Sequence, residues 1–408
     1  MNEAGCDYKQ MLMPIDEALQ LLLNSADVIT ETELVQLNEA NTRVLAEDIV
    51  SKIKVPPADN SSMDGYAVRS EEFLGVDEKK LPVSQRIPAG TVGVELQPGT
   101  VARIFTGATI PAGSDAVVMQ EVCVAEGEQV TIRGPFSAGE NIRCAGEDIN
   151  IGDTILETGL KLRPQDIGLL ASIGVSQVKV YRRLRVATFF TGDELREPGA
   201  DLELGQIFNS NRYTLQGLLE NLNCDFINLG IVEDTLEATK AAMLKAAESA
   251  DLVMTSGGVS VGEEDYIRIA LEELGQLDLW RINIKPGKPL AFGQVSNTPF
   301  LGMPGNPVSV FATFCIFARP FILKKQGVRE IEANSFMVPA AFTWERAGTR
   351  NEYLRAKIKD GKIEIFSHQG SGVLISTSWA NGLVFIPENT TVKVNDLVEF
   401  TPFSEISV

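Results

Sequence analysis

DLVMTSGGVSVGEEDY (residues 251–266), INIKPGKPLAFG (282–293) and LGMPGNPVS (301–309) are the stretches that decide the fold of this chain. In each of them an apolar run meets a glycine- or proline-rich turn that carries hydroxyl, carboxylate or ammonium groups. Sheets of α/β proteins place their ligand sites at such turns, where strands end and helices begin. We therefore expect the functional site at these turns.

The region from about residue 184 alternates between short apolar runs and amphipathic segments. Alternation of this kind predicts a parallel sheet covered by helices on both faces. The predicted strands are 185–190, 224–232, 251–257, 280–284, 290–295 and 300–303, and the predicted helices are 211–222, 235–250 and 265–275. A long apolar helix from Pro307 toward Lys325 closes this domain.

The remaining segments follow other patterns. Helical periodicity predicts one packing helix around residues 15–22 and a second around Val35 to Val50. Short runs between Pro, Gly and Asn predict a β-rich insertion from about residue 55 to 142, and RPQDIGLLASIG (163–174) predicts a helix. After about residue 332 the chain reads as a small β domain, with a hairpin that turns at Asp360 and Gly361.

Composition excludes several classes of protein. The chain has 408 residues and a net charge of −19, which argues against sequence-independent binding to nucleic acid or to anionic membranes. Charged, Gly or Pro residues interrupt every apolar run, so we expect no membrane span, and the N-terminus lacks a signal sequence, so we expect a cytoplasmic protein. Five scattered cysteines without C-x-x-C spacing are expected to be reduced thiols, mostly buried, and the single His368 excludes multi-histidine metal sites.

Acidic residues follow three of the predicted strands. Glu194, Asp234 and Asp265 come after the strands at 185–190, 224–232 and 251–257. Because parallel strands end at one edge of the sheet, we expect these carboxylates to converge there and to hold Mg²⁺ against a phosphate. Helix N-capping is the alternative function for each acid taken singly.

Two further turns carry groups suited to an anion. KPGKP places Lys285 and Lys288 on a turn stiffened by prolines, which predicts an anion site, although a solvated basic loop is the alternative. MPGNPVS places Ser309 at the start of a helix, where an ordinary proline-initiated cap is the alternative. The chain has neither a Walker A sequence nor a G-x-G-x-x-G dinucleotide fingerprint, which disfavours an ATPase or a dehydrogenase.

The β-rich insertion and its flank carry a second set of polar turns. DNSSMDGYAVR (59–69), TGATIPAGSD (106–115) and RCAGEDI (143–149) contain Asp59, Thr106 and Asp148 beside glycines. Such turns are either a network of caps or part of a binding site.

Taken in order, these motifs resemble a known family. DNSSMDGYAVR, TGATIPAGSDAVV, AGEDI, TGDEL, TSGGVSVGEEDY, KPGKPLAFG and MPGNPVS resemble the molybdopterin molybdenumtransferases, the MoeA and gephyrin E-domain family, along nearly the whole chain. The resemblance implies an elongated homodimer of multidomain α/β plus β chains. Its domains would be a linking domain (1–50 and 143–180), a β-rich inserted domain (51–142), a central α/β, molybdopterin-binding, adenylyltransferase-like domain (181–329) and a C-terminal β-barrel (330–408).

The resemblance also implies an activity: insertion of molybdate into adenylylated molybdopterin, with Mg²⁺, to release AMP and molybdenum cofactor. It implies cross-dimer action of the N- and C-terminal site residues, and a molybdopterin adenylyltransferase and cofactor-delivery proteins as partners. Phe190 departs from the family pattern, in which a small residue usually precedes TGDEL. The implied catalytic residues are Asp59, Thr106, Asp148, Glu194, Asp234 and Asp265, with Asp234 and Asp265 as metal ligands. The implied substrate-binding residues are Ser256, Gly257, Gly258, Ser260, Lys285, Lys288, Pro304, Gly305, Asn306, Ser309, Arg350 and Ser371.

Two other functions remain open from the sequence. Adenylyl transfer to molybdopterin, the activity of the related α/β domain, would consume ATP. A gephyrin-like scaffold would need no catalysis.

Overall fold

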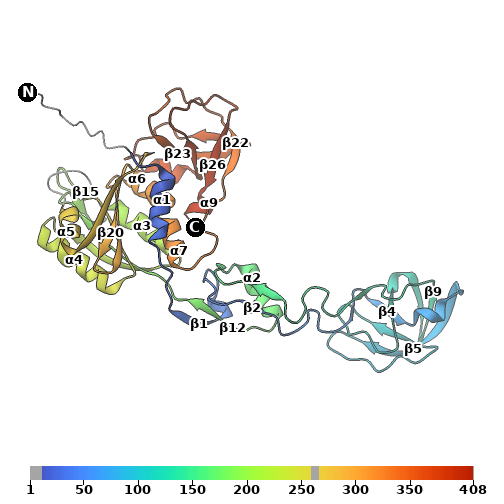
Figure 1. Cartoon of the computed structure of the whole chain (residues 1–408). Helices are drawn as coiled ribbons and strands as arrows, with labels where there is room; N and C mark the ends of the chain where they lie inside the picture. Colours follow the sequence, from blue (N-terminus) through green and yellow to red (C-terminus); the bar gives the residue numbers. More distant parts are fainter. Residues whose placement is uncertain (1–11, 259–265, 408) are drawn as a thin grey trace, which may run out of the picture.

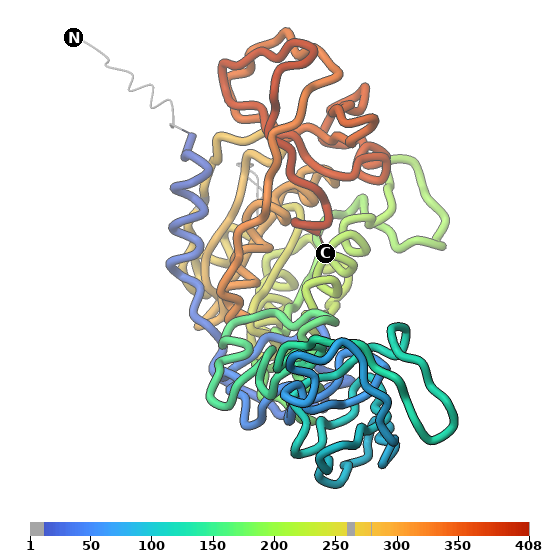
Figure 2. Tube along the Cα trace, turned by 90° about the vertical axis from the view of Figure 1, so that its right-hand side faces the viewer, coloured from blue at the N-terminus to red at the C-terminus, as the bar shows by residue number. Residues whose placement is uncertain are grey.

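The computed structural model describes residues 12–258 and 266–407, which form an elongated molecule (Figure 1). A central α/β domain carries a C-terminal β domain at one end and a small linking domain at the other. A second β domain lies beyond the linking domain, far from the central sheet (Figure 1). Figure 2 views the molecule from the side of this second β domain, which lies in front, with the C-terminal domain at the top.

The central sheet has the strand order β16-β13-β17-β21-β20-β18. The first four strands are parallel, but β20 and β21 pair antiparallel, as do β18 and β20. The sheet is therefore mixed, which corrects the expectation of a parallel sheet. The reason is local. A two-residue turn at Ser296 and Asn297, with Ser296 at φ 57°, connects β20 to β21 and reverses the direction of the chain. Two consecutive parallel strands would need a longer crossover connection, usually a helix. The strands are β13 (Arg185–Thr191), β16 (Asp225–Val232), β17 (Leu252–Ser256), β18 (Gly275–Arg281), β20 (Pro289–Val295) and β21 (Thr298–Met303).

Helices cover both faces of this sheet, as predicted. One apolar core joins the sheet to α1 (Ile15–Asn24), α3 (Ser210–Asn221) and the helix from Pro307 to Lys325, and a second core joins it to α4 (Leu236–Ser249) and α5 (Tyr266–Leu274). Phe190 is fully buried in the first core, which also contains Leu215 and Met303. Its bulk therefore fills the interior of the domain.

The helix from Pro307 to Lys325 is continuous but irregular. It consists of α6 (Pro307–Thr313), a π-helical segment (Phe314–Ala318) and α7 (Arg319–Lys325). Pro320 lacks the N–H of a regular turn, which accounts for the widened turn before it. Within the described residues this is the one helix long and apolar enough to cross a membrane, contrary to the expectation that none exists, but 72% of its most apolar window is buried inside the protein.

The linking domain contains strands where a second helix was expected. Residues around Val35 to Val50 form β1 (Thr32–Gln36), a 3₁₀ turn (Leu37–Glu39) and β2 (Ile49–Val50). Strand β1 pairs with β12 (Gln177–Tyr181) and β2 with β11 (Thr154–Leu156). The helix prediction was wrong because β-branched residues such as Val35 and Ile49 pack on partners that lie more than 100 residues away. The predicted helix at residues 163–174 is present as α2 (Pro164–Ser172).

The two β domains differ in closure. The inserted domain has a six-stranded sheet of order β7-β4-β6-β5-β9-β8. The C-terminal sheet closes into a barrel, because Ala340, after β22, bridges Ile363 in β24 at the far edge. The inserted-domain strands are β4 (Gly65–Val68), β5 (Glu78–Ile87), β6 (Val101–Ile104), β7 (Ala116–Met119), β8 (Cys123–Glu126) and β9 (Gln129–Arg133); the barrel strands are β22 (Phe336–Pro339), β23 (Asn351–Lys359), β24 (Lys362–Ile365), β25 (Gly382–Ile386) and β26 (Leu397–Pro402).

Candidate functional site

A cleft lies at the carboxyl ends of the parallel strands, as the sequence predicts. It consists of two adjoining pockets of about 670 and 590 Å³, which share Gly257, Gly305 and Asn306. We call the first the basic pocket and the second the strand-end pocket. Gly258, on the rim of the basic pocket, has φ 62°, and a Cβ there would lie 2.7 Å from the side chain of Ile267. The turn after β17 therefore requires glycine.

The basic pocket is cationic in an acidic protein. Its described lining includes three charged residues, and all three are cations: Lys285, Lys288 and Arg350. Lys285 is about half exposed, and its Nζ lies 3.1 Å from Oε2 of the buried Glu352. A cluster of cations in a chain of net charge −19 is suited to an anion, which would offset their mutual repulsion.

The C-terminal barrel supplies one wall of the basic pocket. Short strand β19 (Ile284–Lys285) pairs in parallel with the start of β23, and the backbone N–H of Val308 donates to the carbonyl of Ser371 over 3.0 Å. These bonds bring Arg350 and Ser371 into the cleft of their own chain. These two residues thus line a pocket together with Lys285 of the same chain, and their expected action across a dimer stays a prediction.

A buried arginine, which the sequence analysis did not single out, holds this wall in place. Arg355 is 1% exposed, and its guanidinium donates to Oγ of Ser376 and to the carbonyl of Gly370, at 3.0 and 3.2 Å. Burial lowers the pKa of Arg355 to about 10. Gly370 and its neighbour Gln369 line the basic pocket, so Arg355 fixes the segment that presents Ser371.

The turns at KPGKP and MPGNPVS form the opposite wall. Gly287, in the first turn, has φ 102°, and a Cβ there would lie 2.5 Å from Oγ1 of the buried Thr313. Ser309, in the first turn of α6, is 3% exposed and lines the pocket with Pro304. At the start of α6 the N–H of Val308 already donates to the Ser371 carbonyl, so this N–H is not free for a ligand in the pocket that Ser309 lines.

The strand-end pocket is built around the N-terminus of α3. Its lining includes Thr191 and Glu194 after β13, Ser256 at the end of β17, and Ser210 and Asn211 at the start of α3. Asn209 caps this helix by accepting a hydrogen bond from the backbone N–H of residue 212. The uncapped N–H groups of the first turn give this pocket a positive helix end.

The predicted acidic cluster is only partly described. Glu194 is exposed and lines the strand-end pocket, and Asp234 is exposed directly after β16, at the same edge of the sheet. Asp265 and Ser260 lie outside the described residues. Within residues 12–258 and 266–407, no three His, Cys, Asp or Glu side chains are grouped closely enough to hold a metal ion by themselves.

Comparison with known proteins agrees with this architecture. Residues 13–174 match the MoeA N-terminal region (domain I and II), residues 187–324 a probable molybdopterin binding domain, and residues 337–403 the MoeA C-terminal region (domain IV). The chain is 41% identical over 404 residues to a molybdopterin molybdenumtransferase of Haemophilus influenzae, covering 97% of this chain and 100% of that protein. The chain belongs to the MoeA family.

Other members of the MoeA family extend the likeness. A molybdopterin molybdenumtransferase of Nostoc sp. is 38% identical, over 91% of this chain and 88% of that protein. The crystal structure of a molybdopterin biosynthesis moeA protein from Pyrococcus horikoshii superposes with a TM-score of 0.85 at 32% identity, covering 96% of this chain and 100% of that one.

Three predicted site residues of this MoeA-family chain lie away from the cleft, at the neck between the linking and inserted domains. Asp59 accepts a hydrogen bond from the backbone N–H of Ala145 over 2.8 Å, and Asp148 is exposed on the next turn. Thr106 donates from both its N–H and its hydroxyl to Oδ1 of Asp64, each over 2.8 Å, and these bonds lower the pKa of Asp64. Figure 1 shows this neck far from the α/β domain of its own chain.

The thiols fit the expectation of reduced cysteines. The four described cysteines are free: Cys224 and Cys315 are buried, Cys123 is half-buried and Cys144 is exposed. Burial raises the pKa of Cys224 and of Cys315 to about 12, so neither is a nucleophile near neutral pH.

Proposed function

We propose that this chain inserts molybdate into adenylylated molybdopterin and releases AMP and molybdenum cofactor. The observation that carries the proposal is the basic pocket beside the strand-end pocket: three cations and the Ser309 and Ser371 segments adjoin a helix N-terminus and the Ser256 turn. Molybdate is a tetrahedral dianion, and the substrate carries a pyrophosphate, so two anions must lie side by side. Two adjoining pockets of this kind support that arrangement.

In the proposed reaction the basic pocket holds molybdate and the strand-end pocket holds the adenylylated end of the pterin. An oxygen of molybdate, or of a water beside it, attacks the phosphorus of the AMP group, the bond to the bridging oxygen breaks, and that oxygen stays with the pterin phosphate. Lys285 and Lys288 stabilise the negative charge that develops in this step. The two dithiolene thiols then form Mo–S bonds in place of Mo–O bonds; their protons leave with the displaced oxygens, as water or on the AMP phosphate, and AMP is released.

Mg²⁺ belongs to this proposal, with Asp234 and Asp265 as its protein ligands and Glu194 beside it. Glu194 and Asp234, the described members of this set, are both exposed, and Mg²⁺ takes one or two carboxylates and obtains its other ligands from water and substrate phosphates. Bound there, it would neutralise charge on the pyrophosphate.

We propose that the active form is a homodimer, in which Asp59, Thr106 and Asp148 of one chain reach the cleft of the other. The position of the neck supports this, since these residues are remote from their own cleft (Figure 1). A cytoplasmic location, and a molybdopterin adenylyltransferase and cofactor-delivery proteins as partners, belong to the same proposal.

The deciding experiment incubates the purified protein with adenylylated molybdopterin and Mg²⁺, with and without molybdate, and follows AMP. Release that requires molybdate and stops with EDTA is expected. Formation of adenylylated pterin from ATP and molybdopterin would instead assign the adenylyltransferase activity. Absence of both reactions would favour a scaffold.

A further inference from the structure

Asn211 makes a contact that neither its sequence context nor the proposed reaction explains. Its side-chain Nδ2 donates to the carbonyl of Gly305 over 2.7 Å and to Oγ of Ser256 over 3.0 Å. Gly305 belongs to the turn before α6 and Ser256 to the turn after β17. The side-chain amide of Asn211 therefore connects the Ser256 turn to the Gly305 turn, at the boundary between the basic pocket and the strand-end pocket.

The direction of these hydrogen bonds is fixed by chemistry. A backbone carbonyl only accepts, so the atom of Asn211 next to Gly305 must be the amide nitrogen. That nitrogen also faces Ser256 Oγ, which must then act as an acceptor toward Asn211. A hydroxyl that accepts on one side keeps its own proton for another partner.

The hydroxyl of Ser256 donates no hydrogen bond to residues 12–258 or 266–407, among which it accepts one from Asn211. Ser256 is 3% exposed and lines the strand-end pocket, so a ligand in that pocket can accept its proton. The first turn of α3, which carries Asn211, presents its positive end to the same pocket. Both features favour an anionic oxygen at this point.

We infer that Asn211 is a positioning residue that orients the Ser256 hydroxyl as a hydrogen-bond donor to an anionic oxygen of the ligand in the strand-end pocket. The inference rests on the proposed function, because it takes that oxygen to be on the phosphate of the adenylyl group. It adds a residue that touches no reacting atom and acts through Ser256.

Asparagine and aspartate have almost the same shape, so N211D separates polarity from packing. An ionised aspartate cannot donate a hydrogen bond, so the Ser256 hydroxyl would donate to this carboxylate instead of to the ligand. The carboxylate would also repel the Gly305 carbonyl and the bound phosphate. A purely packing role predicts that N211D is milder than N211A. The orienting role predicts the reverse order.

The experiment measures AMP binding by calorimetry, and kcat and KM for molybdate-dependent AMP release, in the full-length protein. We expect N211A to weaken AMP binding about tenfold and to raise the KM for adenylylated molybdopterin by the same factor. N211D should change both quantities about a hundredfold. N221A is the matched control, because Asn221 lies on the same helix and its Nδ2 donates to the carbonyl of Ser407 over 2.7 Å, away from the cleft. N221A should leave the affinity for AMP and the KM for adenylylated molybdopterin unchanged.

A double-mutant cycle covers the case in which N211D fails to fold. If Asn211 acts through Ser256, the N211A/S256A double variant should bind AMP no more weakly than S256A alone. Additive losses, or N211D milder than N211A, would overturn the inference while the wild type still turned over. A wild-type protein that bound no AMP and released none would overturn the proposed function and the inference together.

Discussion

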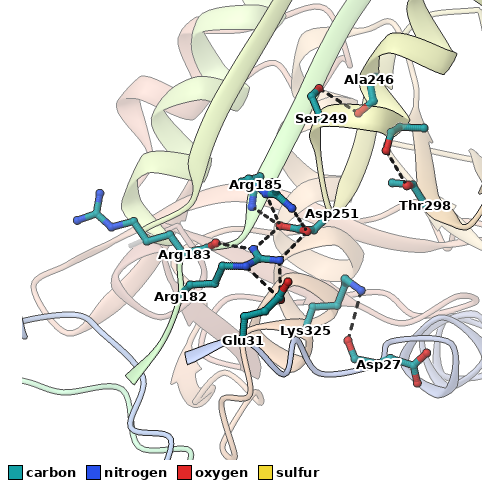
Figure 3. Close-up of polar contacts among 11 residues, drawn as sticks. Asp27, Glu31, Arg182, Arg183, Arg185, Ala246, Ser249, Asp251, Thr298 and Lys325 are labelled. Carbon is teal, nitrogen blue, oxygen red and sulfur yellow. Dashed lines mark hydrogen bonds and ion pairs between the residues drawn. The ribbon is translucent and has the colours of Figure 1, made fainter. Parts of the chain in front are cut away.

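Arg182 and Asp251 form a bidentate ion pair, in which Nη1 of Arg182 lies 2.7 Å from Oδ2 of Asp251 and Nη2 lies 2.9 Å from Oδ1 (Figure 3). Arg182 follows the last strand of the linking domain, and Asp251 precedes β17 of the α/β domain. The same guanidinium also binds Glu31, which precedes β1, and Arg185 gives Asp251 a second cation (Figure 3). This network joins the linking domain to the opposite edge of the sheet from the cleft.

The first prediction concerns the pH dependence of this junction. Burial alone would raise the pKa of Asp251, but hydrogen bonds from Arg182 and Arg185 outweigh it and hold that pKa well below its usual range. The stability that the ionised group contributes is therefore complete above the pKa of the unfolded chain, about 3.9, and is lost as the pH falls further. D251N should lower the free energy of unfolding at pH 7 by about 2 kcal/mol and flatten its fall below pH 4.

Urea unfolding at a series of pH values measures both effects. E364Q is the control, because Glu364 pairs with Lys359 at an exposed site and its loss should cost less than about 0.5 kcal/mol. Equal decreases in the free energy of unfolding of D251N and E364Q would show that the Arg182–Asp251 pair stabilises the protein no more than an exposed ion pair does.

A second prediction separates the two lysines of the basic pocket. K288A should lower the affinity for molybdate about tenfold, with a smaller difference at high salt, and leave stability unchanged. K285A should lower the affinity similarly and also destabilise the protein by about 1–3 kcal/mol, because it leaves the buried carboxylate of Glu352 without its cation. Calorimetry and thermal unfolding test this, with K80A, from an exposed pair with Glu126, as control. Unchanged stability in K285A would contradict it.

A third prediction tests the shared site of the proposed homodimer. D59N and K288A should each lose most of the activity as purified homodimers when molybdate is kept well below its wild-type KM. After mixing and subunit exchange, mixed dimers should regain activity, because one of their two clefts combines an intact neck with an intact basic pocket. Molybdate-dependent AMP release measures the recovery, and a mixture of D59N with T106V, which share the neck, is the control. No recovery in the first mixture, with exchange shown by differently tagged chains, would place the neck residues outside the partner's cleft.

A fourth prediction concerns the turn that presents the lysines. Gly287 has a positive φ, and a Cβ there would meet Thr313 Oγ1 at 2.5 Å, whereas Gly90 has a positive φ with open space around it. G90A should cost about 1 kcal/mol for backbone strain alone, and G287A about 2–4 kcal/mol together with a loss of molybdate affinity. Thermal unfolding and calorimetry compare the two. Equal costs would mean that the turn moves away from Thr313 without consequence.

Local pattern was enough to predict much of the fold. Strands β13, β16, β17, β20 and β21, the helices on both faces of the central sheet, helix α2 and the hairpin between β23 and β24 all follow from periodicity and turn residues. Strand β18 (Gly275–Arg281) is an exception, because it begins five residues before the strand predicted at 280–284. That hairpin turns at Asp360 and Gly361, with φ 50° and 74°, as an aspartate-glycine pair favours. These features depend on residues close together in the chain, so the sequence carries the whole signal.

The mistaken and missing predictions share a different cause. The helix expected around Val35 to Val50 is absent, and the ends of this segment lie in β1 and β2, whose partners β12 and β11 are distant in the sequence. Strand β20 was expected to be parallel to its neighbours, but a two-residue turn makes it antiparallel to β21. Asn211 sits in a helix that the sequence predicts, but nothing in the local pattern indicates that its amide joins the Ser256 and Gly305 turns. Arg355 carries no local signal for its role behind Ser371.

The sequence by itself determined the domain types, the family and the turns that carry functional groups, because apolar periodicity and glycine-rich motifs are properties of neighbouring residues. Only the tertiary structure decided which turns form one cleft: it brings the barrel residues Arg350 and Ser371 to Lys285 within one chain and leaves Asp59 and Thr106 at a remote neck. The reason is physical. Contacts between segments that lie 60 or more residues apart depend on how whole domains pack. That packing depends on the complementarity of the domain surfaces and not on the sequence of any single short segment.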